Sequence, residues 1–93
     1  MKAYKHLVKH SLSKGFTVSV FDGEEWQVNR SNKYQAIIDA IESVEESQLK
    51  IRNAEGDYMG WALIIPSLFD DETVADFSSN EFMENWFDNE YTV

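Results

Sequence analysis

The segment from Phe16 to Val28 contains two short runs in which apolar and polar residues alternate, and Asp22-Gly23 separates them. Alternation with a period of two is typical of strands that bury one face, and an Asp-Gly pair between such runs favours a tight turn. The sequence therefore predicts an antiparallel hairpin made of residues 16–20 and 26–28.

The loop length of this hairpin decides which side chains share a face. A two-residue loop at Asp22-Gly23 would pair Ser19 with Trp26 and leave apolar side chains on both faces. A three-residue loop at 21–23 instead puts Gly23 in the left-handed position of a bulge and Phe21 at the tip of the turn. We expect this second register, which pairs Val20 with Glu24, Val18 with Trp26 and Phe16 with Val28.

Three segments have the apolar spacing of a helix with one buried stripe. The first covers residues 2–13 and ends at Gly15. The second is capped by Ser31-Asn32, ends near Val44, and buries Tyr34, Ile37, Ile38 and Ile41. The third covers about residues 81–90, follows a cap at Ser79 or Asn80, and turns inward Phe82, Met83, Trp86 and Phe87.

Three more strands are expected, at residues 48–52, 58–65 and 73–77. The first has Leu49 and Ile51 inward and Lys50 and Arg52 outward, and Pro66 ends the second. Hairpin connections dominate, and only one helix lies between strands. The sequence therefore predicts an α+β fold in the order α-β-β-α-β-β-β-α, with a five-stranded, mainly antiparallel sheet and helices packed on one face.

The length and composition bound the class of protein. A chain of 93 residues can bury about 65% of its surface, which suffices for one core, so we expect a single domain over residues 1–93. The hydrophobic fraction of 43% excludes a disordered acidic tail. The sequence has no cysteine and no membrane-length apolar run, so a reducing cytoplasm is the expected location.

Charge is distributed unevenly along the chain. Residues 1–14 carry +4, residues 15–52 carry −3, and residues 53–93 contain ten acids and no lysine or arginine, so the net charge is −9. A field of that sign opposes binding to DNA, RNA or anionic lipid, because phosphate contacts need basic side chains. We therefore expect no direct nucleic-acid or membrane contact, and a basic protein surface as the partner.

Catalytic and metal-binding motifs are weak. His6 and His10 have a spacing that can share a metal, but two histidines with four nearby lysines do not make a site. Asp76, between apolar residues, is the best candidate for a general acid, but an outward position on a half-buried strand is the favoured explanation. We expect no enzyme activity, no metal and no cofactor.

The remaining candidates for function are surface residues. Glu81, Glu84 and Asp88 would share one face of the last helix, with axial rises of about 4.5 and 6 Å. With Asp70, Asp71, Glu72 and the acidic side of the middle helix, which carries Asp39, Glu42 and Glu46, they can form a duplex-like array of negative charge. Phe21 and Phe69 are candidate apolar anchors beside it.

The runs 18–31, 60–65 and 72–77, which read VSVFDGEEWQVNRS, GWALII and ETVADF, resemble a group of small acidic proteins encoded by tailed bacteriophages. The similarity covers about residues 15–90 and rests on a glycine turn and strand aromatics. In size and charge the chain is also similar to phage inhibitors of restriction enzymes, CRISPR effectors and uracil-DNA glycosylase, several of which imitate DNA.

This resemblance implies a non-catalytic phage protein that inhibits a host nucleic-acid-processing or defence enzyme through an acidic, DNA-mimicking surface. The contact residues would be Asp70, Asp71, Glu72, Glu81, Glu84, Asp88, Phe21 and Phe69. The alternative is a small structural or assembly protein of a phage, which dimerises when the basic first helix of one copy meets the acidic region of another.

Overall fold

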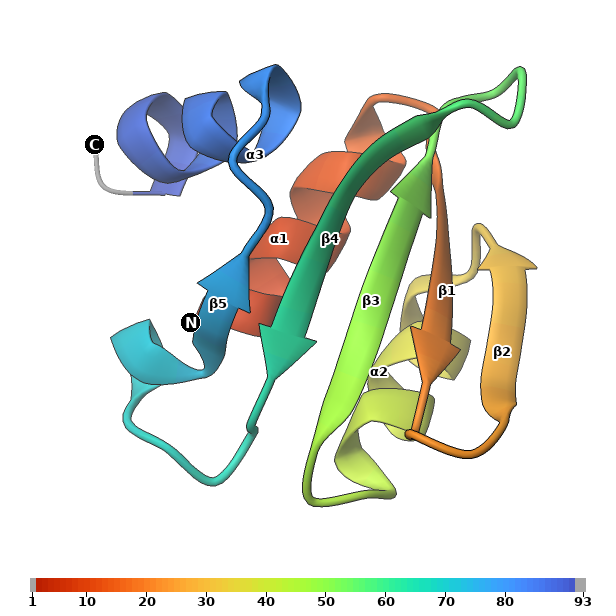
Figure 1. Cartoon of the computed structure of the whole chain (residues 1–93), viewed down its shortest axis with the longest axis vertical. Helices are drawn as coiled ribbons and strands as arrows, with labels where there is room; N and C mark the ends of the chain where they lie inside the picture. Colours follow the sequence, from red (N-terminus) through yellow and green to blue (C-terminus); the bar gives the residue numbers. More distant parts are fainter. Residues whose placement is uncertain (1, 92–93) are drawn as a thin grey trace.

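Ten elements follow one another in the computed structural model, which describes residues 2–91 (Figure 1). They are α1 (Ala3–Ser13), β1 (Thr17–Phe21), β2 (Trp26–Ser31), α2 (Tyr34–Glu42), β3 (Ser47–Arg52), β4 (Tyr58–Ile64), the 3-10 turn η1 (Asp70–Glu72), β5 (Val74–Phe77), α3 (Glu81–Asn85) and the π-helical segment η2 (Trp86–Tyr91). The predicted α+β class and the order α-β-β-α-β-β-β-α are confirmed.

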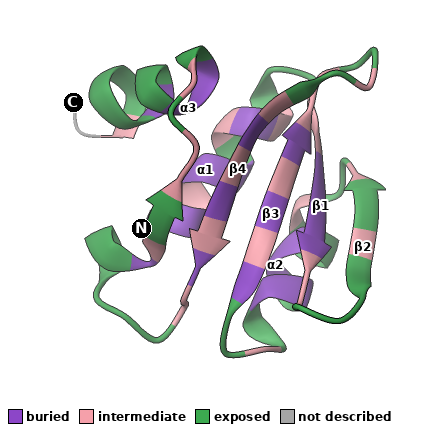
Figure 2. Ribbon diagram, in the orientation of Figure 1, coloured by how far each residue is buried: buried purple, intermediate pink, exposed green. Residues whose placement is uncertain are grey.

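The five strands form one antiparallel sheet with the order β2-β1-β3-β4-β5. α1 and α2 lie behind this sheet in Figure 1. Buried and half-buried residues alternate along β3 and β4, as Figure 2 shows, because successive side chains point to opposite faces. The helix side holds the core, while no helix covers the opposite face among the described residues. None of the helices in residues 2–91 has the length and apolar character needed to cross a membrane.

The core is built from the apolar stripes that the helices and strands turn toward each other. α1 contributes Tyr4, Leu7 and Val8, and it ends where Gly15 takes a φ of +79°. The other large buried side chains are Val18, Val20, Ile37, Ile41, Leu49, Ile51, Ile64, Met83 and Trp86.

The predicted register of the first hairpin is wrong. Phe21 pairs with Trp26 and Val20 with Val28, so residues 22–25 form a four-residue loop and Phe21 ends its strand. The Asp22 carboxylate accepts hydrogen bonds from the backbone N–H groups of Glu24 and Glu25, both at 2.8 Å. The Asp22 side chain stabilises the four-residue loop, and the pattern of apolar residues does not indicate this interaction. Gly23 does adopt a positive φ, of 103°.

The start of α2 also differs from the prediction. Lys33 is the N-cap residue and makes no side-chain capping bond, because an ammonium group cannot accept a hydrogen bond. Ser31, the predicted cap, belongs to β2 and accepts a hydrogen bond from the Lys33 N–H at 3.1 Å. The helix ends at Glu42, two residues before the predicted end at Val44. Its buried stripe includes Ile37, Ile38 and Ile41, as expected.

The C-terminal helix changes its winding at Trp86, from α in α3 to π in η2. A π-helix makes i→i+5 hydrogen bonds, so each turn holds more residues and the buried stripe shifts. Phe82, Met83 and Trp86 are buried as predicted, but Phe87, predicted to face inward, is 40% exposed. The wider turn instead stacks Tyr91 on Trp86, with ring centroids 5.3 Å apart.

Candidate functional site

Acidic residues of the C-terminal half gather on the β5 side of the molecule. Figure 1 shows η1 and α3 at the β5 edge of the sheet. The six predicted acidic contact residues are all exposed: Asp70, Asp71, Glu72, Glu81, Glu84 and Asp88. We call these six residues, together with Phe69, the acidic surface.

A hydrogen bond from Tyr91 to Asp71 joins the two parts of the acidic surface. The phenolic O–H of Tyr91 donates to Asp71 Oδ1, which fixes η1 against the C-terminal segment η2. Partial burial of Tyr91, and then the bond to the Asp71 carboxylate, raise the pKa of Tyr91 to about 12. The tyrosine therefore stays a neutral donor through physiological pH.

Phe69 is the most exposed large apolar side chain of the described residues, with 84% of its surface accessible. It directly precedes η1, so Asp70, Asp71 and Glu72 follow it in the chain. A cavity of about 220 Å³ lies beside it, lined by Ser67, Leu68, Phe69 and Glu72. An exposed aromatic ring next to three carboxylates combines an apolar anchor with an anionic field.

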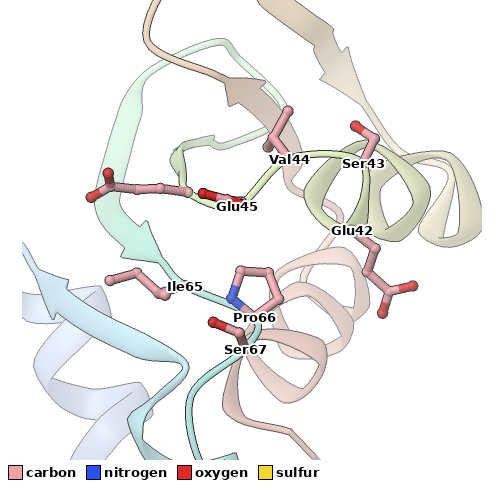
Figure 3. A pocket seen from close by; sticks show the side chains of 8 residues that line it. Glu42, Ser43, Val44, Glu45, Ile65, Pro66 and Ser67 are labelled. Atoms are coloured by element: carbon pink, nitrogen blue, oxygen red, sulfur yellow. The ribbon is translucent and has the colours of Figure 1, made fainter.

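A larger groove, of about 770 Å³, lies next to this turn between the end of α2 and the chain after β4 (Figure 3). Glu42, Glu45 and Glu46 give it negative charge, and the other lining residues are Ser43, Val44, Ile65, Pro66 and Ser67. Ser67 lines both the groove and the cavity at Phe69, so the two hollows are neighbours. We call this feature the acidic groove; the sequence analysis did not predict it.

One wall of the acidic groove is held by α1. Glu42 accepts a hydrogen bond from the Tyr4 hydroxyl at 2.5 Å and lies 3.7 Å from the Lys5 ammonium group. Lys2 donates to the carbonyl oxygen of Pro66 at 2.6 Å. Burial, and then the carboxylate of Glu42, raise the pKa of Tyr4. Two of the four lysines near the N-terminus are thus engaged within the chain.

The three predicted carboxylates of the last helix lie in two differently wound segments. Glu81 and Glu84 both lie in the α-helical part, so their expected axial rise of about 4.5 Å applies. Asp88 lies in η2, where the π winding changes its angular position from that in an α-helix. The common face of all three carboxylates stays a prediction. Glu84 accepts a hydrogen bond from the Ser79 hydroxyl at 3.3 Å.

Phe21 does not join the acidic surface. It is half-buried at the end of β1, on the side of the sheet that no described helix covers, and its ring packs on Trp26 with centroids 5.0 Å apart. β1 is three strands away from β5, which corresponds to roughly 14 Å. Phe21 therefore lies on a different part of the surface from the β5 edge.

The residues considered for catalysis have structural surroundings. Asp76 is exposed on β5 and accepts a hydrogen bond from the Phe77 N–H, which fits the outward position considered for it. His6 Nδ1 accepts a hydrogen bond from the Trp86 indole at 3.0 Å, and His10 stacks on Phe82. Within residues 2–91, no group of three or more His, Asp or Glu side chains is placed to hold a metal ion.

The sequence analysis also missed the uncovered side of the sheet. Its prominent side chains are Phe21, Trp26, Lys50, Arg52, Tyr58 and Trp61, which we call the open sheet face. The outward assignment of Lys50 and Arg52 is consistent with their half-buried positions between buried neighbours. The alternation of inward and outward residues along this strand, together with helices predicted on one side only, was the sequence feature that indicated an uncovered face.

Comparison of the chain with protein-family models, with curated proteins and with solved structures found no match.

Proposed function

We propose that this protein acts by binding, without catalysis, and that its acidic surface occupies the basic nucleic-acid-binding channel of a protein partner. The observation that carries this proposal is the position of Phe69, which is 84% exposed and directly followed by Asp70, Asp71 and Glu72. Folding leaves this ring in water, where a partner can bury it.

The carboxylates and the ring would contribute to different properties of the complex. Opposite charge accelerates association and makes it sensitive to salt, since exposed charges interact through a screened field. A buried aromatic anchor slows dissociation, because the water-excluded centre of an interface carries most of the binding energy. The bond between Tyr91 and Asp71 holds η1 in one arrangement, which lowers the entropy lost on binding.

The acidic groove supplies a place for a basic side chain of the partner. Glu45 and Glu46 are exposed beside the C-terminal end of α2, where the helix dipole is negative. Val44, Ile65 and Pro66 line the same groove and can cover the aliphatic stem of a lysine or arginine. Charge and shape are thus complementary to the side chains that line a DNA-binding channel.

The resemblance to small acidic phage proteins supports a setting for this activity. In the proposal, the protein works in the cytoplasm of an infected bacterium and blocks a host nucleic-acid-processing or defence enzyme by imitating DNA. The two helical carboxylates Glu81 and Glu84 extend the acidic surface beyond η1.

A capture experiment with matched variants tests the proposal. The wild-type protein, D70K/E72K and E24K/E25K are immobilised and exposed to bacterial lysate at low and high salt. Both double variants change the net charge by the same amount, but Glu24 and Glu25 lie in the β1–β2 loop, three strands away from β5. We expect the wild type and E24K/E25K to retain a nucleic-acid-binding protein at low salt and D70K/E72K to lose it. Equal retention by the two double variants would reject a localised site.

Self-association through α1, the alternative function, has less support. Lys2 and Lys5 contact Pro66 and Glu42 of their own chain, which leaves less positive charge for the acidic region of a second copy. Sedimentation across a salt series separates the two functions, since self-pairing predicts a dimer at low salt that dissociates at high salt.

A further inference from the structure

The open sheet face alternates aromatic and basic side chains across neighbouring strands. Lys50 lies directly opposite Trp61 in the β3–β4 register, and Arg52 lies opposite Tyr58. The Lys50 ammonium group is 5.9 Å from the centre of the Tyr58 ring. At the other end of the face, the rings of Phe21 and Trp26 pack together.

Several of these side chains are held in place from within the sheet. The Trp61 indole N–H donates to Gln48 Oε1 at 3.0 Å, which fixes the plane of the ring. The Arg52 guanidinium group is 3.4 Å from the hydroxyl of Ser19 on β1. Trp26 and Tyr58 nevertheless remain 47% and 52% exposed. The face therefore presents fixed, accessible aromatic surface that folding does not use.

The two cations of this face, Lys50 and Arg52, lie on the central strand β3, although the net charge of the whole chain is negative. In the strand register, Asp76, opposite Leu63 on the edge strand β5, shares the face, and Glu55 and Asp57 lie in the exposed turn that joins β3 to β4. β3, which carries Lys50 and Arg52, is two strands away from β5, or about 10 Å, which exceeds the screening length of about 8 Å at physiological ionic strength. The net charge of −9 therefore does not describe the centre of the sheet.

We propose that the open sheet face binds single-stranded nucleic acid. Bases would stack on Trp61 and Tyr58 and on the pair formed by Phe21 and Trp26, while Lys50 and Arg52 contact phosphates. Base–aromatic stacking beside cations is the general chemistry by which proteins hold single strands. This proposal departs from the expectation of no direct nucleic-acid contact, because that expectation summed charge along the chain and did not place Lys50 and Arg52 together on one face of the sheet.

The spacing of the aromatic groups favours a nucleic acid over an acidic peptide. Trp26 on β2 and Trp61 on β4 are three strands apart, or roughly 14 Å. A ligand that reaches both needs flat groups repeated along a flexible anionic chain, which every nucleic-acid strand has and an acidic peptide has only if it also contains aromatics. Glu24 and Glu25 border the Trp26 end, and both cations of the face lie on β3, so the phosphates are assigned to Lys50 and Arg52.

Fluorescence anisotropy with a labelled oligothymidylate of about 12 nucleotides tests the proposal on the full chain. The variant K50Q/R52Q is compared with K9Q/K14Q, which removes two exposed charges from α1 and the residue that follows it, on the helix side. Loss of two phosphate contacts should reduce the slope of log affinity against log salt by about 1.4, while the control keeps the wild-type slope.

A second matched pair tests the stacking contribution. Trp26→Ala should weaken binding about tenfold, whereas Phe87→Ala should leave it unchanged. Trp26 and Phe87 have similar exposure, 47% and 40%, but Phe87 lies in η2 and outside the open sheet face. Circular dichroism establishes that each variant is folded.

Four outcomes would overturn the proposal. The first is no binding of the oligothymidylate at about 50 mM salt, where electrostatic attraction is strong, and the second is an equal loss of affinity by the two variants of either matched pair. The third is equal affinity for duplex DNA, which cannot stack its bases on the face, and the fourth is stronger binding of polyglutamate, which would assign the face to an acidic protein segment. The acidic surface shares no residue with the open sheet face, so these results do not depend on the function proposed above.

Discussion

The indole N–H of Trp86 donates a hydrogen bond to Nδ1 of His6 at 3.0 Å and thereby joins the C-terminal segment to α1. The two residues are 80 positions apart in the sequence. Tyr91 packs its ring against both, with centroid distances of 5.3 Å to each. This three-ring cluster fixes η2, and through Tyr91 and Asp71 it also fixes the acidic turn η1.

Trp86→Phe should lower the free energy of unfolding by about 2 kcal/mol, because it removes a buried hydrogen bond and part of a buried ring. Trp86 is 1% exposed, whereas Phe87 is 40% exposed. The control Phe87→Leu should therefore change stability by less than about 0.5 kcal/mol. Urea denaturation measures both; similar losses would contradict the assigned burial.

Gly60→Ala should destabilise the protein by about 2 kcal/mol through a clash on the helix side of β4. A Cβ atom at Gly60 would lie 2.5 Å from Cγ of Met83. Because Gly60 is not among the glycines with positive φ, contact with Met83 is the main obstacle. A double-mutant cycle with Met83→Ala should show a coupling energy above about 1 kcal/mol, and additive effects would refute the packing of α3 on β4.

Alkaline pH should weaken the fold through Tyr91. The pKa of Tyr91 rises from 10.0 to about 12 on folding. The stability that the neutral tyrosine adds to the folded state is therefore complete below pH 10 and is lost as the pH rises through 12. In a spectrophotometric titration of the folded protein, Tyr91→Phe should remove a component near pH 12, and Asp71→Asn should move it toward lower pH. A tyrosine component that stays near pH 12 in Asp71→Asn would show that the hydrogen bond to Asp71 does not form.

Mild acid should also weaken the fold, through His10. Burial holds the pKa of His10 below its ordinary value of 6.5, and nearby Lys14 and His6 act in the same direction, while Glu90 opposes them. Nε2 of His10 is buried without a hydrogen-bond partner among the described residues. The unfolded chain therefore binds more protons below pH 6.5, and stability should fall as the pH decreases from about 7 to 5.

The variant His10→Phe isolates this effect, since it keeps a ring against Phe82 and removes the titrating group. Urea midpoints measured at several pH values should depend less on pH in the variant than in the wild type. Parallel curves for the two proteins would mean that His10 titrates alike in the folded and unfolded chains.

Most of the fold was predictable because the sheet and helices bury stripes with clear periods of two and 3.6 residues. The strand at 48–52 and the helix stripe at Ile37, Ile38 and Ile41 follow from local pattern alone. The hairpin register was not predictable in this way, because one carboxylate, that of Asp22, sets the loop. The π winding of η2 accompanies contacts of Trp86 and Tyr91 with His6, which no local window contains.

The candidate site was predictable in part for a similar reason. Exposure of Phe69 and of the acids around it follows from their place in a charged loop. The acidic groove needs the end of α2 and the residues after β4 to meet, and the open sheet face needs the strand order. Both depend on tertiary structure, so a reading of charge along the chain misses them.

Competition with DNA tests the central claim most directly. The partner retained by the wild-type protein is purified, and its affinity for a labelled DNA duplex is measured with increasing amounts of wild type, D70K/E72K or Phe69→Ala. If the acidic surface occupies the DNA-binding channel, the apparent Kd for DNA rises in proportion to the wild-type concentration, and both variants shift that rise to higher concentrations. A ternary complex with unchanged affinity for DNA would contradict the account.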